Sequence, residues 1–121
     1  MHKLIIIFSL FSIQLVAQAT LPAELDSPAE RADRLTKEMI EKVGLFPSQI
    51  KVVDSLNYAY ALEMQAEVFD KKLSTWGQYR RGNRIMNRKD EELKGILTGK
   101  QFEKYDDLKS EVLWKIVGQI F

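Results

Sequence analysis

The chain contains no cysteine, and its only histidine is His2, at the amino terminus. Disulfide bonds and lipid anchors on a processed amino terminus both require cysteine, so neither can form here. Tight zinc sites and the common nucleophile–base pairs of enzymes draw on cysteine and histidine side chains. We therefore expect no enzyme activity, no cofactor and no tightly bound metal. A weak calcium site formed by carboxylate pairs such as Glu63 with Glu67 is the alternative that remains for metal binding.

An apolar run long enough to cross a membrane is also missing. The longest stretch, Leu4 to Val16, has 13 residues, whereas a hydrocarbon core about 30 Å thick needs roughly 20. Lys3 precedes this stretch and small residues follow it at Ala17 and Ala19, which is the layout of a secretory signal peptide. We predict cleavage of residues 1–19 and a single periplasmic domain over 20–121, without a stable membrane anchor. Export argues against nucleic acid as a partner.

Apolar residues recur at helical spacing, and no useful stretch alternates with a period of two, so an all-α fold of about four helices is predicted. Ser27, Pro28 and Glu30 are typical of a capped helix start, and Gly44 is placed to end that helix. A second helix is predicted from Pro47. The apolar stripes of these two helices are Leu35, Met39 and Val43, then Val53, Leu56, Tyr60, Met64 and Val68.

Between Ser74 and Asn83 the apolar pattern lapses, and Gly77 and Gly82 lie inside this stretch. We interpret it as a turn, with a third helix from about Arg84. A fourth helix is predicted after Thr98. Its apolar stripe is Phe102, Tyr105, Leu108, Val112, Ile116 and Ile120.

Two helix starts share a Leu-x-x-x-Gln arrangement. It comprises Leu45 and Gln49 before the second helix and Leu97, Thr98 and Gln101 before the fourth. In each copy the leucine can enter the core, and the glutamine three residues after the cap can bond back to the backbone. Phe46 replaces the capping hydroxyl in the first copy, so only half of the reciprocal bonding is expected there.

This pair of motifs in an exported helical chain resembles the Spy/CpxP family of periplasmic proteins, which carry Leu-Thr-x-x-Gln twice. The resemblance spans roughly residues 33–109. It implies a curved helical hairpin that dimerises into a cradle and binds unfolded or partly folded polypeptides without ATP, and it implies a role in envelope stress. Phe46 and Gly99 depart from the family pattern, as does the short segment between the motifs.

Charge is unevenly spread along the chain. Residues 71–94 contain 8 basic and 3 acidic side chains, whereas residues 20–70 contain 5 basic and 10 acidic ones. Basic and apolar residues mixed in one region suit binding of flexible polypeptides. The candidate client-binding residues are Trp76, Tyr79, Arg80, Arg81, Arg84, Ile85, Met86 and Arg88. The alternative is a solvated helix face with Trp76 and Tyr79 filling a helix junction.

Together these features favour an ATP-independent periplasmic chaperone or stress-response protein that forms a homodimer and binds unfolded or partly folded proteins. The alternative is an envelope regulatory or sensor-type protein with one specific protein partner. Protection of several unrelated unfolded clients from aggregation would distinguish the first function from the second.

Overall fold

The first described helix begins at its expected cap. Ser27 Oγ accepts a hydrogen bond from the Glu30 N–H at 3.1 Å, and Pro28 fills the first helical position. This helix, α2 (Pro28–Glu38), continues into a π-helical turn, η2 (Met39–Val43). Gly44 ends it with a φ of 79°, a left-handed conformation that favours glycine. The computed structural model describes residues 26–120, with side chains up to residue 111; the predicted signal peptide lies outside that range.

Residues 47–120 form three long helices. They are α3 (Pro47–Met64), extended by the π-helical turn η3 (Gln65–Phe69), then α4 (Thr75–Lys94) and α5 (Gly99–Ile120). Between residues 26 and 120 there is no strand, and no helix is long and apolar enough to span a membrane. The all-α prediction with four helices is therefore confirmed.

The predicted turn between Ser74 and Asn83 is wrong, because α4 begins at Thr75 and continues through this segment. Ser74 Oγ accepts the Gly77 N–H at 3.0 Å and caps the helix start. Gly82 packs close to the Met64 side chain, and a Cβ built there would lie 3.7 Å from Sδ. The apolar stripe lapses because most side chains on the first turns of α4 are exposed. The actual connection is shorter and lies between Phe69 and Ser74.

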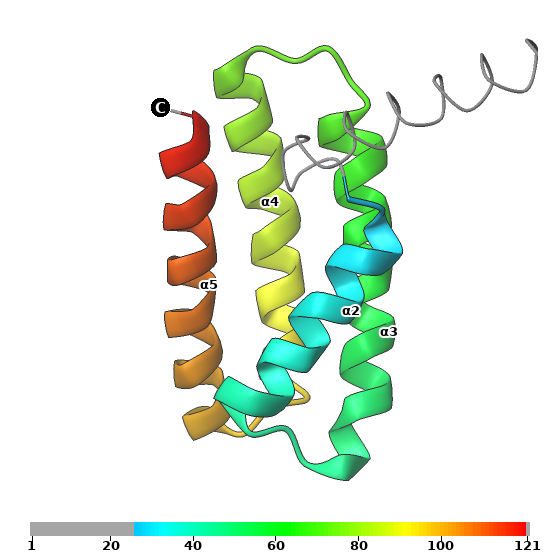
Figure 1. Ribbon diagram of the computed structural model, residues 1–121, viewed down its shortest axis with the longest axis vertical. Coiled ribbons are helices and arrows are strands. Elements are labelled where there is room, and N and C mark those ends of the chain that lie inside the picture. The colour runs from blue at the N-terminus through cyan, green and yellow to red at the C-terminus, as the bar shows by residue number, and fades with distance from the viewer. Residues whose placement is uncertain (1–25, 121) are drawn as a thin grey trace, which may run out of the picture.

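Figure 1 shows α3, α4 and α5 running lengthwise beside one another, with α2 crossing in front. α3 and α4 form an antiparallel hairpin, and α2 packs mainly along α3 while η2 contacts α5. The larger core cluster joins these elements and comprises Met39, Val43, Leu45, Val53, Leu93, Leu97, Tyr105 and Leu108. A smaller cluster of Tyr60, Val68 and Ile85 lies between α3 and α4.

Candidate polypeptide-binding surface

The two motif glutamines meet in the core and hold two helix starts together. Gln49 and Gln101 are both buried, and each side-chain amide donates to the other's Oε1 at 2.9 Å. Each Oε1 also accepts the backbone N–H at its own helix cap. Gln49 accepts from Phe46 at 2.8 Å, and Gln101 accepts from Thr98 at 2.9 Å.

The second amide proton of each glutamine is donated to a backbone carbonyl next to the other motif. Gln49 donates to the Ile96 carbonyl at 3.0 Å, and Gln101 donates to the Gly44 carbonyl at 3.0 Å. Each bonded carbonyl belongs to the residue just before the motif leucine, so the two motifs are bonded to each other reciprocally. The capping role of each glutamine followed from its spacing in the sequence. The bond between the two motifs did not, because it depends on how the helix ends meet in space.

The motif leucines occupy the core, as their position ahead of each helix predicted. Leu45 and Leu97 are both buried in the larger core cluster. Thr98 Oγ1 also accepts the Gln101 N–H at 3.1 Å, which completes the second capping box. Phe46 has no hydroxyl, so the first box keeps only the bond from its backbone N–H to Gln49. The motif is thus a structural device that fixes α3 and α5 relative to each other.

Two aromatic side chains are exposed on the first turns of α4. Trp76 and Tyr79 retain 65% and 63% of their accessible surface, the highest values among the exposed large hydrophobic residues of the described chain. Their rings stack with centroids 5.6 Å apart and an interplanar angle of 23°. Because neither ring fills a helix junction, the structure removes the alternative in which they plug the α3–α4 connection. Stacking also preorganises the pair as one flat apolar surface.

The four candidate arginines divide into two pairs. Arg81 lies 3.7 Å from a Glu67 carboxylate oxygen, and Arg88 forms an ion pair with Glu63. Arg80 and Arg84 are exposed, and neither forms an ion pair or hydrogen bond with any described side chain. Only this second pair can therefore offer its guanidinium groups to a partner without first breaking an intramolecular contact.

Ile85 and Met86 are less exposed than the stacked aromatic pair on the first turns of α4. Ile85 keeps 2% of its surface and belongs to the smaller core cluster, so it offers nothing to a client. Met86 is only half-buried. The exposed set that remains consists of Trp76, Tyr79, Arg80 and Arg84, together with Lys72 in the connection before α4, which is exposed and has no ion pair in the described chain. We refer to these five residues as the basic tip.

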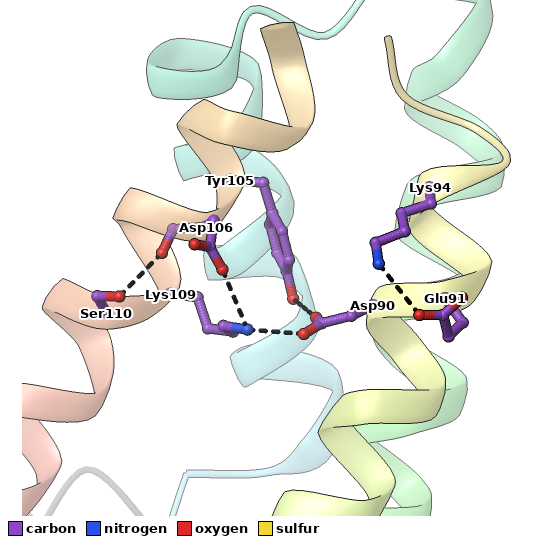
Figure 2. A network of polar contacts seen from close by, with 7 residues as sticks. All are labelled: Asp90, Glu91, Lys94, Tyr105, Asp106, Lys109 and Ser110. Atoms are coloured by element: carbon purple, nitrogen blue, oxygen red, sulfur yellow. Dashed lines mark hydrogen bonds and ion pairs between the residues drawn. The ribbon is translucent and has the colours of Figure 1, made fainter. Parts of the chain in front are cut away.

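Away from the tip, a polar network ties α5 to α4 (Figure 2). Asp90 accepts hydrogen bonds from Tyr105 Oη at 3.1 Å and Lys109 Nζ at 2.6 Å. Lys109 also lies 3.3 Å from Asp106. Burial raises the pKa of Tyr105, with Asp90 contributing in the same direction, so its hydroxyl stays protonated and donates. These contacts are structural and leave the carboxylate of Asp90 occupied.

Lys89 is the one buried lysine of the described chain, with 3% of its surface exposed. It lies on the face of α4 between Ile85 of the smaller cluster and Leu93 of the larger one. Burial lowers its pKa to about 8, partly offset by the neighbouring Asp90 charge. Within the described side chains, no group of three or more His, Cys, Asp or Glu residues is placed to hold a metal ion.

Residues 17–105 match the family described as "Domain of unknown function (DUF4890)", and the chain belongs to that family. Neither the curated proteins nor the solved structures contain a match. The family match covers α2, α3, α4 and the first turns of α5, so both Leu-x-x-x-Gln motifs and the basic tip lie within it.

Proposed function

We propose that this protein is an ATP-independent periplasmic chaperone or stress-response protein that binds unfolded or partly folded polypeptides through the basic tip. The observation that carries the proposal is the exposed Trp76–Tyr79 stack next to Arg80 and Arg84, which form no ion pair with the side chains that the structure describes. Exposed aromatic and arginine side chains are the residue types most enriched at sites that dominate protein binding. A soluble helix has no need of such a stack for its own folding.

The geometry suits weak contacts with many sequences. Trp76 and Tyr79 present rigid apolar faces at low cost in side-chain entropy, and the adjacent arginines can bond carboxylates or backbone carbonyls. Trp76, Tyr79, Arg80 and Arg84 are all exposed on the first turns of α4. A client therefore gains affinity from apolar and acidic character rather than from a particular sequence.

The expected export signal and the paired motifs support the same function. Reciprocal Gln49–Gln101 bonding gives both copies of the Leu-x-x-x-Gln motif a shared structural role in this chain, and this motif pair carries the resemblance to Spy/CpxP proteins. The predicted signal peptide is the basis for proposing that the protein acts in the periplasm, and the resemblance is the basis for proposing a link to envelope stress.

The test is an aggregation assay with the mature chain, residues 20–121, and several unrelated unfolded clients. We expect suppression for most clients, and we expect Trp76→Ser with Tyr79→Ser to reduce it at least fivefold. Phe46→Ser is the matched control, because Phe46 is also an exposed aromatic residue but lies at the other end of α3. Circular dichroism must show unchanged helicity in all variants.

A second readout follows binding directly. Trp76 and Trp114 are the two tryptophans, so Trp114→Phe leaves Trp76 as the only tryptophan emitter. Client binding should then shift its emission to shorter wavelength, because the indole leaves water. No shift and no suppression with any client would refute the proposal. Suppression for a single client alone would favour the alternative, an envelope regulator with one specific partner.

A further inference from the structure

The connection before α4 and the first turns of α4 form the longest acid-free stretch of the described chain. Residues 71–89 contain 7 basic side chains and no acidic one. Ion pairs with carboxylates of α3 and η3 involve three of these basic side chains, and Lys89 is buried. The other three belong to the basic tip, are exposed and form no ion pair in the described chain: Lys72, Arg80 and Arg84. The basic tip therefore carries charge of one sign.

The exposed side chains of the basic tip on α4 lie along one face of that helix. Trp76, Arg80 and Arg84 recur every four residues, and Tyr79 follows Trp76 after three, so all four share this face. Among residues 74–88, every exposed side chain is aromatic, basic, amide or hydroxyl. The face thus lacks both carboxylates and exposed aliphatic side chains.

This combination of side chains matches the boundary between water and a lipid bilayer. Tryptophan and tyrosine are enriched at the headgroup level, because their rings are apolar while the N–H or O–H group needs a polar partner. Arginine bonds phosphate oxygens, and clustered basic residues are attracted to anionic phospholipids. A neutral ligand would leave the three free basic side chains without counter-charges. The face therefore complements a surface that bears phosphate groups.

We infer that the basic tip docks the protein on the surface of bilayers that contain anionic phospholipid. The aromatic stack lies at the headgroup level, and the three free basic side chains contact lipid phosphates. This docking goes beyond the proposed chaperone function and does not rest on it, although both use the same residues. A docked molecule cannot offer its tip to a client, so lipid and client compete for it.

The expected strength is that of a reversible contact. Each basic side chain close to an anionic bilayer strengthens binding roughly fivefold. The three free basic side chains should therefore favour anionic over neutral bilayers by about a hundredfold at low salt. This preference should disappear near about 1 M salt, because such a concentration screens exposed charges over a few ångströms.

Vesicle flotation of the mature chain, residues 20–121, tests the inference. The two probes are vesicles of phosphatidylcholine alone and vesicles of equal parts phosphatidylcholine and phosphatidylglycerol. We expect about a hundredfold tighter binding to the anionic vesicles at low salt. Lys72→Gln with Arg80→Gln and Arg84→Gln should remove this preference, because the three charges that face the lipid phosphates are gone.

The matched control removes the same number of positive charges elsewhere. It combines Lys51→Gln, Lys100→Gln and Lys104→Gln, at positions that are exposed and form no ion pair in the described chain. The net charge of this variant equals that of the tip variant, so a difference between the two reports where the charge lies. The control should keep the preference for anionic vesicles, and circular dichroism must show equal helicity in both variants.

Tryptophan emission tests how deeply the stack lies. In the Trp114→Phe background, Trp76 is the only tryptophan emitter. Anionic vesicles should shift its emission to shorter wavelength. Lipids brominated next to the headgroup should quench it more strongly than lipids brominated near the end of the acyl chain. Stronger quenching by the deeper bromine, or no shift at all, would contradict the headgroup placement.

Two flotation results would overturn the lipid site itself. One is equal binding to neutral and anionic vesicles, and the other is a tip variant that keeps the preference. A chain that protects clients from aggregation but does not bind anionic vesicles would refute the docking and leave the proposed chaperone function intact. A chain that binds these vesicles and protects no client would support the docking and refute the chaperone function.

Discussion

Gln49 and Gln101 form more hydrogen bonds than helix-capping residues usually do. Their side chains satisfy two cap N–H groups, the Ile96 and Gly44 carbonyls, and each other. A buried donor or acceptor that loses its partner costs about 1–3 kcal/mol. Removing either glutamine therefore leaves several groups of the other motif unsatisfied, including the amide of the remaining glutamine.

This reciprocity predicts strong coupling between the two positions. Gln49→Ala and Gln101→Ala should each lower the free energy of unfolding by about 2–3 kcal/mol, because each strands buried polar groups. The double variant should lose about 1–2 kcal/mol less than the sum of the two. Urea unfolding of all four proteins measures the cycle, and Gln78→Ala, an exposed position on α4, is the control. Strict additivity would show that the two motifs act independently.

Lys89, unlike Gln49 and Gln101, lowers the stability of the folded protein at neutral pH. Its pKa is lowered by burial to about 8 in the folded protein, from 10.5 in an exposed lysine. The folded state therefore binds fewer protons than the unfolded state between these two values, so stability rises with pH across that window. Below pH 8 the folded protein bears the full cost of a buried ammonium, on the order of 3 kcal/mol.

Lys89→Met should consequently stabilise the protein at pH 7 by up to about 3 kcal/mol, since it keeps the apolar stem and removes the charge. The gain should shrink by about 1 kcal/mol between pH 7 and pH 9. Denaturant unfolding over this range measures both effects, and it avoids the titration of Tyr105 at higher pH. Lys100→Met, at an exposed position, should show neither effect. A pH-independent gain would mean that packing, not charge, accounts for it.

At the scale of helices, residues near each helix end predicted where that helix begins or stops. Which side chains of the helix are buried depends on tertiary contacts. Ser27, Gly44, Pro47 and Thr98 act on the backbone within a few residues, so the helix boundaries they predict are confirmed. The segment 74–83 was misassigned because a stripe of buried residues reports packing, not helicity. The first turns of α4 are helical but mostly exposed, so they carry no stripe to detect.

For the candidate surface, the sequence indicates a region but does not show which of its side chains are exposed. Basic and aromatic residues concentrated over 71–94 identified the region. Whether Tyr79 or Ile85 faces solvent depends on where α4 meets α3, which no local pattern reports. A related case is α3, which also carries exposed apolar side chains such as Val52 and Leu62, and only the packing of α2 and α4 shows which of its apolar residues the core uses.

The molecule as a whole separates its charges, with acidic residues in excess over 20–70 and basic residues in excess over 71–94. Arg80 and Arg84 are the exposed arginines of α4 whose charge no described carboxylate neutralises by an ion pair. If they attract clients, the effect must depend on the client's charge and on salt, because exposed charges are screened within about 10 Å at 0.1 M.

Arg80→Glu with Arg84→Glu should therefore weaken binding of a net-negative unfolded client about tenfold at low salt, at roughly 0.7 kcal/mol per reversed charge. The same variant should bind a net-positive client more tightly, and both differences should disappear near 1 M salt. Lys100→Glu with Lys104→Glu makes the same change in net charge on α5, away from the tip, and should have little effect. Titrations monitored by Trp76 fluorescence measure all four cases. An equal loss for both clients would mean that the two arginines contribute by packing, and the aromatic pair alone would then define the binding surface.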